Sequence, residues 1–350
     1  MVKTRQWILN KKPDDFPVID GSSNATFKLV DNETPELKDG QVLLKILYFS
    51  NDPAQRGWIS KLRDPKRLYV PPVEEGKPLR AGNVSEVIES KADNYKKGDH
   101  VRAQGSWSEY QVVDASLVVP APPLPKGRSE THYLGALGLT GLTAYYGIKE
   151  VVRTTKDDVV VVSGAAGATG SMVVQIAEKL LHAKTVIGIA GTDEKCRWVE
   201  SLGADKCLNY KSSSFAKDLI AATPDFADVY FDNVGGEILD LMFSRMARYG
   251  RIAACGAISN YNNSADKTVG LKNWFEVISM RIEVRGFIVI DYLHKIQEVS
   301  EIFKKGIEDG TLQVGDEGEH VVETKFEDVP KTWVKLFEGA NQGKLVTKLV

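Results

Sequence analysis

The sequence has few cysteines and few histidines. Its three cysteines, at positions 196, 207 and 255, are too few and too scattered for a disulfide framework, so a reducing, cytoplasmic setting is expected. A structural zinc site needs about four thiolate or imidazole ligands at close spacing. The five histidines lie apart from one another and from the cysteines, so we expect no metal.

Neither a charge excess nor a long hydrophobic run is present. Lys and Arg number 45 against 47 Asp and Glu, which leaves a net charge of −2 and no electrostatic reason to bind nucleic acid or an anionic membrane. The N-terminus has no apolar stretch of the kind that a secretory signal needs. At 350 residues, two domains are the default expectation.

Residues 159–177 combine a strand, a glycine turn and a helix. Residues 159–162 are four valines, which favour a buried strand. Gly164, Gly167 and Gly170 follow with G-x-x-G-x-x-G spacing, and helical apolar spacing then predicts a helix opened by Gly170. A bare turn before a helix N-terminus is how proteins bind a dinucleotide diphosphate. Since the usual spacing is G-x-G-x-x-G, ordinary loop punctuation is the alternative.

The expected strands and helices follow a different order in the two parts of the chain. Residues 1–120 contain short, closely spaced strands, which indicate a mostly antiparallel, barrel-like domain. From residue 158, strands and helices alternate, which predicts a Rossmann-type, doubly wound parallel sheet and an α/β fold. We place the catalytic domain at 1–130 and 311–350, and the dinucleotide-binding domain at 131–310. The six expected strands are 159–162, 185–190, 206–209, 227–232, 250–256 and 282–290.

The end of the second expected strand indicates which dinucleotide binds. A carboxylate there would select NAD by contacting the ribose 2′-hydroxyl. Here Gly191 leaves room for a 2′-phosphate and Lys195, one helical turn on, offers it a cation, so NADPH is favoured. Asp193 remains an alternative ribose partner. Tyr210, at the end of the third strand, is a candidate to flank the phosphate.

Two further strand ends carry candidate residues. The fourth strand ends in Asp232-Asn233-Val234-Gly235-Gly236, where the Asn233 amide is expected to face the cofactor and the glycines allow close approach. The fifth leads into residues 255–262, beside the expected nicotinamide position. Cys255 is expected to be a buried small residue and not a nucleophile, because no histidine is near it in the sequence.

Together these motifs resemble the zinc-independent medium-chain dehydrogenase/reductase superfamily. Within it, the chain is similar to the NADPH-dependent alkenal/one double-bond reductases, which include leukotriene B4 12-hydroxydehydrogenase/prostaglandin reductase and curcumin-reductase-like enzymes. The resemblance covers nearly the whole chain. It is carried by residues 6–9, 51–57, 138–145, 165–170, 231–236, 255–262 and 341–344.

The resemblance implies a GroES-like catalytic domain beside the Rossmann domain, and a homodimer joined through the edge of the sixth strand. It also implies a small-molecule enone or alkenal substrate. The cofactor-binding residues implied are Gly167, Ala168, Thr169, Gly170, Lys195, Tyr210, Asn233, Cys255, Gly256, Ala257, Ile258, Ser259, Tyr261, Phe287, Ile288, Val289 and Asn341.

Some positions depart from the family pattern. Ala54 replaces a common tyrosine or threonine, which removes a hydroxyl, and Thr140 replaces a common proline. The substrate-side loop at 58–80 has no close match. The sequence therefore leaves the physiological substrate and the stereochemistry of hydride transfer open.

The expected reaction is reduction of the C=C bond of an α,β-unsaturated aldehyde or ketone, with hydride added at the β-carbon and a proton at the α-carbon. Without a metal, a hydrogen-bond donor must stabilise the enolate oxygen, and Tyr261 is the candidate catalytic residue. A loop aromatic that only packs on the ribose is the alternative for Tyr261. An NADPH quinone oxidoreductase and a non-catalytic NADPH-binding protein are the alternative functions.

Overall fold

The computed structural model describes residues 1–125, 128–268 and 270–350, and the chain divides into two compact units. Unit 1 contains Met1–Gly135, Asn262–Ala265 and Glu319–Val350. Unit 2 contains Ala136–Tyr261 and Asp266–Gly318. The expected boundaries were residues 130 and 311; residues 262–265, which the sequence does not single out, return briefly to unit 1.

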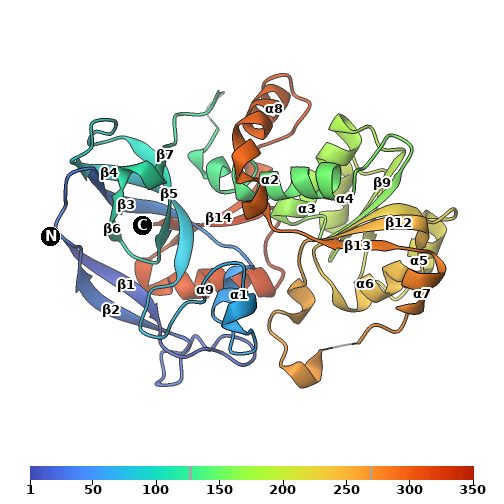
Figure 1. Ribbon diagram of the computed structural model, residues 1–350, viewed down its shortest axis with the longest axis horizontal. Helices are drawn as coiled ribbons and strands as arrows, with labels where there is room; N and C mark the ends of the chain where they lie inside the picture. The colour runs from blue at the N-terminus through green and yellow to red at the C-terminus, as the bar shows by residue number, and fades with distance from the viewer. Residues whose placement is uncertain (126–127, 269) are drawn as a thin grey trace. The chain divides into compact units, whose positions relative to one another are not determined.

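Unit 2 is built on a parallel sheet whose described strands follow the order β10-β9-β8-β11-β12-β13 (Figure 1). This order reverses direction on either side of β8, which is the arrangement of a Rossmann sheet, so the predicted fold class is confirmed. The strands are β8 (Val159–Ser163), β9 (Thr185–Ala190), β10 (Lys206–Asn209), β11 (Ala227–Asp232), β12 (Met246–Ala254) and β13 (Glu283–Gly286).

Helices cover both faces of this sheet because successive strand residues point to opposite sides. Val160 and Val162 join one core with the helices α2, α3, α4 and α8, whereas Val161 joins a second core with α5 and α6. The helices are α2 (Leu139–Tyr145), α3 (Ala168–Gln175), α4 (Asp193–Ser201), α5 (Phe215–Ala222), α6 (Gly236–Phe243), α7 (Phe275–Ser279) and α8 (Ile296–Glu308).

Three element boundaries differ from the prediction. Helix α3 begins at Ala168 and not at Gly170, since the Ser171 N–H already donates to the Gly167 carbonyl at 2.9 Å. The strand expected at residues 250–256 starts earlier, because Met246 pairs with Ala227 and starts β12, and helix α6 ends before it at Phe243. The sixth strand ends at Gly286, after which the Phe287 ring packs against Phe231 in the core.

Unit 1 is mostly antiparallel, as predicted. Its larger described sheet has the order β14-β15-β3-β4-β5-β7, and β6 also pairs with β3; β14 and β15 are parallel to each other. A separate pair is formed by β1 (Lys3–Leu9) and β2 (Phe27–Glu33). The sheet strands are β3 (Gln41–Ser50), β4 (Arg80–Ser90), β5 (His100–Ser106), β6 (Tyr110–Asp114), β7 (Val118–Pro120), β14 (Glu319–Thr324) and β15 (Lys344–Leu349).

The C-terminal segment completes unit 1. Strand β15 lies between β14 and β3, so it is an interior strand of the sheet. The short helices α1 (Gln55–Trp58) and α9 (Val329–Val334) accompany this sheet, and Trp333 of α9 is fully buried against Trp107 and Phe27. Trp107 therefore belongs to the core of unit 1 and lies just before β6.

Candidate active site

The glycine turn connects β8 to α3 through a backbone without large side chains. Gly164 has φ +59°, a conformation that glycine adopts without strain, and the Gly167 N–H donates to the Gly164 carbonyl at 2.9 Å. Gly167 caps α3 with extended backbone, so the amides of Ala168, Thr169 and Gly170 have no acceptor within the helix. Helix geometry thus leaves these donors for an anion.

Gly170 is required by packing in this turn. A Cβ at Gly170 would lie 2.2 Å from the Gly164 carbonyl oxygen and 2.8 Å from the Ala165 Cα, so no side chain fits. Gly167, Ala168 and Thr169 are partly exposed, whereas Gly170 is buried. The bare turn and the accessible start of α3 therefore fit the diphosphate of a dinucleotide.

Tyr210 and Lys195 lie at the carboxyl ends of β10 and β9, where the adenosine side was predicted. The Tyr210 ring covers Gly191: a Cβ there would lie 3.1 Å from its Cε1 atom. Lys195 stands in the first turn of α4, whose N-cap Thr192 accepts the Lys195 N–H at 3.2 Å. Burial, together with nearby Lys211, lowers the pKa of Lys195. Gly191, the exposed Tyr210 phenol and the cations of Lys195 and Lys211 therefore lie together beside the carboxyl end of β9.

Lys211 was missed by the sequence analysis, and Asp193 is engaged elsewhere. The Lys211 ammonium lies 5.9 Å from the centroid of the Tyr210 ring. The Asp193 carboxylate accepts a hydrogen bond from the Asn209 side chain at 2.7 Å, which opposes its alternative assignment as a ribose partner. The signal that could have identified Lys211 is a basic residue directly after the tyrosine that ends the third strand.

Asp232 organises the end of β11. Its Oδ1 atom accepts hydrogen bonds from the Tyr230 hydroxyl at 2.9 Å, the Ser163 hydroxyl at 3.1 Å, and the Val234 and Gly235 amides at 3.0 and 2.9 Å. Burial raises the pKa of Asp232, although these donors act in the opposite direction. The carboxylate therefore fixes the turn that carries the next residues.

The Asn233 side chain is also part of this structural network. Its Nδ2 atom donates to the Ser163 carbonyl at 2.7 Å, and its backbone N–H donates to the Ser163 hydroxyl at 3.0 Å. The NH₂ group joins the ends of β8 and β11, and the expected contact of Asn233 with the cofactor stays a prediction. Asn233 nevertheless lies beside the glycine turn, since a Cβ on Gly164 would be 3.4 Å from the Asn233 Cβ.

Residues 255–261 follow β12. Within this segment Tyr261 folds back onto residues 257 and 258. The Ala257 N–H donates to the Tyr261 hydroxyl oxygen at 3.2 Å, and the Tyr261 N–H donates to the Ile258 carbonyl at 3.3 Å. Ser259 anchors the segment by donating to the Val234 carbonyl at 2.6 Å. Burial raises the pKa of Cys255 to about 12, so this thiol stays protonated, as a non-nucleophilic residue would.

Phe287, Ile288 and Val289 follow the end of β13. Phe287 and Val289 pack against the core of unit 2, and the Phe287 ring meets Phe231 edge-on at 6.2 Å between centroids. A Cβ on Gly147 would lie 2.6 Å from the Phe287 ring, so this packing depends on a glycine in the neighbouring helix. These residues shape the carboxyl end of the sheet through apolar contact.

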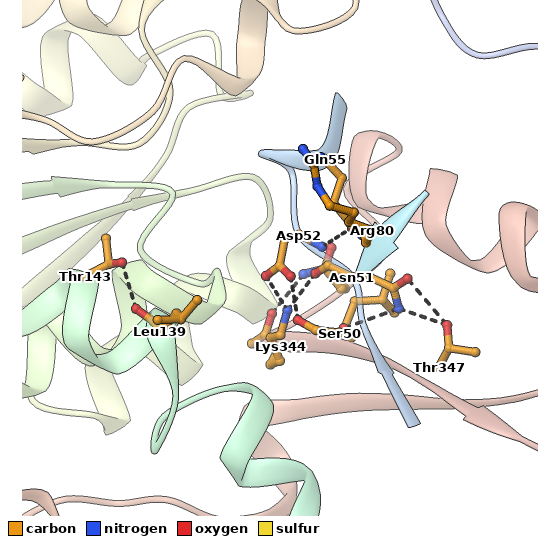
Figure 2. Close-up of polar contacts among 12 residues, drawn as sticks. Ser50, Asn51, Asp52, Gln55, Arg80, Leu139, Thr143, Lys344 and Thr347 are labelled. Carbon is orange, nitrogen blue, oxygen red and sulfur yellow. Dashed lines mark hydrogen bonds and ion pairs between the residues drawn. The ribbon is translucent and has the colours of Figure 1, made fainter. Parts of the chain in front are cut away.

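Unit 1 carries its own polar cluster near the motif at residues 51–57 (Figure 2). The buried Lys344 ammonium donates to the Asn51 carbonyl at 2.7 Å and to Asp52 Oδ1 at 2.8 Å, and Ser50 donates to Asp52 Oδ2 at 2.6 Å. Asn341, the predicted cofactor residue of this unit, donates to the Gly343 carbonyl at 2.9 Å. The motif at residues 51–57 is recognisable in the sequence, but its pairing with Lys344 is visible only in the structure.

No group of three or more His, Cys, Asp or Glu side chains in residues 1–125, 128–268 and 270–350 is arranged to hold a metal ion. No helix within the same ranges is both long enough and apolar enough to cross a membrane.

Comparison with known sequence families places the chain in one class. Residues 5–120 match the family described as the N-terminal domain of oxidoreductase, and residues 168–305 match the family described as zinc-binding dehydrogenase. Together with the two-unit fold, these matches show that the chain belongs to the medium-chain dehydrogenase/reductase superfamily of oxidoreductases.

Individual relatives narrow this class. The chain is 34% identical to prostaglandin reductase 1 of Bos taurus, over 99% of this chain and 100% of that protein. It is 37% identical to the NADP(+)-dependent 2-alkenal reductase of Nicotiana tabacum, over 92% and 90% of the two chains. The crystal structure of CurA from Vibrio vulnificus in complex with NADPH matches with a TM-score of 0.87 and 31% identity, over 99% of each chain. The resemblance to the alkenal and prostaglandin reductases is therefore confirmed.

Proposed function

We propose that this enzyme reduces the C=C bond of α,β-unsaturated aldehydes and ketones. NADP-dependence and the alkenal substrate are in the name of the tobacco relative, and the Vibrio relative binds NADPH. The observation that carries the proposal is the Tyr261 phenol, held by the Ala257 N–H at the end of a Rossmann strand. A hydrogen-bond donor at this position can stabilise the negative charge of an enolate that forms during the reaction.

NADPH is the cofactor, and it supplies the hydride when bound. Gly167, Ala168, Thr169 and Gly170 would hold its diphosphate, because the turn is bare and the first amides of α3 are accessible. Lys195, Tyr210 and Lys211 would hold the 2′-phosphate. The remaining predicted contacts on the nicotinamide side are Asn233, Cys255, Gly256, Ala257, Ile258, Ser259, Phe287, Ile288, Val289 and Asn341.

Tyr261 is proposed to stabilise the negative charge that develops on the substrate carbonyl oxygen. An unperturbed phenol has a pKa of about 10, so it remains a donor at neutral pH. The Ala257 N–H orients the phenol and stabilises its oxygen if the proton is passed to the α-carbon. Water is the other possible source of that proton.

Replacing Tyr261 by Phe tests this role. The variant should lose about 10²-fold or more in kcat for enal reduction, which is the usual contribution of general acid catalysis. Tyr249→Phe is the matched control, because Tyr249 is 66% exposed in β12 and outside the predicted site. A loss smaller than about tenfold at Tyr261 would contradict a main donor role.

The acceptor itself is tested by following NADPH absorbance with the wild-type protein. An alkenal, a curcuminoid enone and a quinone should be compared at the same concentrations. Faster turnover of the quinone would favour a quinone reductase, and turnover of none of them would favour a non-catalytic NADPH-binding protein.

We further propose a cytoplasmic homodimer joined through β13. This strand ends the order of the parallel sheet, and Val284 is exposed on it. Exposed Trp274, the N-cap residue of helix α7, and exposed Phe275 and Ile278 on that helix supply apolar area for a second copy. Phe275→Asp should shift the mass measured by light scattering from dimer to monomer, whereas Val119→Asp, at an exposed site of unit 1, should not.

A further inference from the structure

Asn209 ends β10 and lies between the two segments that carry Lys195 and Lys211. Its Nδ2 atom donates to the Asp193 carboxylate at 2.7 Å, and its Oδ1 atom accepts the Lys211 N–H at 3.0 Å. Asp193 is the first residue of α4, two positions before Lys195. One partly buried side chain therefore joins the first turn of α4 to the backbone that follows Tyr210.

The backbone around Asn209 is held by the sheet and not by this side chain. Asn209 pairs with Ala190 at the end of β9, and the Tyr210 N–H donates to the Ala190 carbonyl at 3.0 Å. The Ser212 N–H closes the next turn by donating to the Asn209 carbonyl at 3.0 Å. Changing the Asn209 side chain therefore removes its link to α4 and leaves the strand end in place.

Asp193 stands where an acid would select the other cofactor. In a Rossmann sheet, a carboxylate near the end of the second strand accepts a hydrogen bond from the ribose 2′-hydroxyl of NAD. The same negative charge repels a 2′-phosphate. Asp193 follows the end of β9 by three residues and is exposed. Its hydrogen bond to the Asn209 side chain therefore occupies an acid that would otherwise act on the ribose.

Lys195 and Lys211 repel each other at the same strand end. Burial and the nearby Lys211 charge lower the pKa of Lys195, and Glu194 acts in the opposite direction. A phosphate that reaches both ammonium groups removes this repulsion, provided that their spacing is kept. The Asn209 side chain keeps it, because it ties the helix that carries Lys195 to the turn that carries Lys211.

We propose that Asn209 is a positioning residue that sets the selectivity of this enzyme for NADPH over NADH. It holds the Lys195 and Lys211 segments together, and it occupies the Asp193 carboxylate so that this acid neither repels the 2′-phosphate nor pairs with an unphosphorylated ribose. The inference rests on the proposed 2′-phosphate site, and all the residues it uses belong to unit 2.

The test measures the dissociation constants of NADPH and NADH by calorimetry. Asn209→Leu removes both side-chain contacts and should reduce the selectivity for NADPH about fivefold or more, because Asp193 loses its donor and Lys211 its acceptor. Adenosine 2′,5′-bisphosphate carries the phosphate but no nicotinamide, and its binding should weaken in parallel with that of NADPH. The binding of NADH should stay unchanged or become tighter.

Exchanging the two side chains gives a readout that a merely structural role would not produce. Asn209→Asp keeps an acceptor for the Lys211 N–H but sets two carboxylates against each other, so it should reduce the selectivity about tenfold or more. Adding Asp193→Asn to Asn209→Asp restores a donor and an acceptor. The double variant should therefore return to within about threefold of the wild-type selectivity, which is a coupling between the two positions.

Glu200→Ala is the matched control. Glu200 Oε1 accepts the Cys207 N–H at 2.9 Å, so it joins the same helix to the same strand at the other end of α4. Its loss should lower the thermal unfolding temperature and leave the selectivity within about twofold of wild type, because the removed hydrogen bond is not beside the cations.

The outcomes separate this inference from the proposed phosphate site. Unchanged selectivity in Asn209→Leu, or no recovery in the exchanged pair, would overturn the role of Asn209 alone if Lys211→Met loses selectivity. An equal loss in Glu200→Ala would also overturn it. A wild-type protein that binds NADPH no more tightly than NADH would overturn the proposed 2′-phosphate site, and with it this inference.

Discussion

Lys344 Nζ lies 2.8 Å from Asp52 Oδ1, although 292 residues separate the two in the chain. The lysine side chain is 4% exposed, and the aspartate side chain is 36% exposed. The pair joins the last strand of the chain to the turn that follows β3. Because the same turn holds Gln55 and thereby Arg80, one ion pair supports the whole polar cluster of unit 1.

Lys344→Met should destabilise the protein by about 1–3 kcal/mol, because Asp52 and the Asn51 carbonyl lose a charged donor in a largely dry place. The free energy of unfolding is measured by denaturant titration. Lys348→Met is the control: Lys348 pairs with Glu323 on the surface, so its loss should cost less than about 1 kcal/mol. Equal losses in the two variants would contradict the role given to Lys344.

Gly170→Ala should cost about 2 kcal/mol or more of stability and reduce NADPH binding, since its Cβ would lie 2.2 Å from a backbone oxygen. Gly167→Ala is the neighbouring comparison. There the added Cβ would lie 3.2 Å from the same oxygen, which requires only a small shift, and the cost should stay below about 1 kcal/mol. Thermal unfolding and cofactor fluorescence check both variants; a more damaging change at Gly167 would argue against the observed packing.

Lys211→Met should weaken NADPH binding by about threefold to tenfold, because one of two cations beside the proposed 2′-phosphate site is lost. NADH lacks this phosphate, so its dissociation constant should stay unchanged. Lys195→Met should show the same pattern with a larger loss, since Lys195 is the more buried cation. Calorimetry with both dinucleotides measures these constants, and a parallel loss for NADH would place Lys211 outside the phosphate site.

Asp232 should make the wild-type protein lose stability as the pH rises. Burial raises the pKa of Asp232 in the folded state, so the folded protein holds this proton more tightly than the unfolded chain does. The associated stability is present below the ordinary pKa of about 3.9 and is lost as the pH rises through the folded pKa. Asp232→Asn lacks this titration.

As the pH rises from about 3.9 through the folded-state pKa, the wild-type protein should therefore lose unfolding free energy relative to Asp232→Asn. The loss should be about 1.4 kcal/mol for each unit by which the folded-state pKa exceeds the ordinary one. Denaturant titrations at a series of pH values measure it. A shift toward the wild-type protein would show that the four hydrogen bonds to Asp232 outweigh its burial.

The fold was largely predictable because strong local patterns specify it. Four valines, a glycine turn and helical spacing identified β8 and α3, and similar alternation identified the other strands of the parallel sheet. The ends of elements were less predictable: the fifth strand was expected to start at residue 250, but the pairing of Met246 with Ala227 starts β12 earlier. Tertiary pairing overrides local preference at such positions.

The candidate site was predictable where a residue follows a strand directly, as Tyr210 does. The candidate site was less predictable where two contacting residues lie far apart in the sequence. Lys344, Asp52 and Arg80 are joined by contacts between segments that no local pattern connects. Asn233 was assigned a ligand-facing amide because it ends a strand, yet the Ser163 carbonyl, 70 residues earlier in the chain, accepts that amide.

The interior place of β15 has a consequence for synthesis on the ribosome. Unit 1 cannot close its larger sheet until the final strand has emerged, because β15 separates β14 from β3. Residues 1–135 therefore keep unpaired strand edges while all of unit 2 is translated. A nascent chain halted before Lys344 would thus present a finished parallel sheet attached to an open, aggregation-prone one.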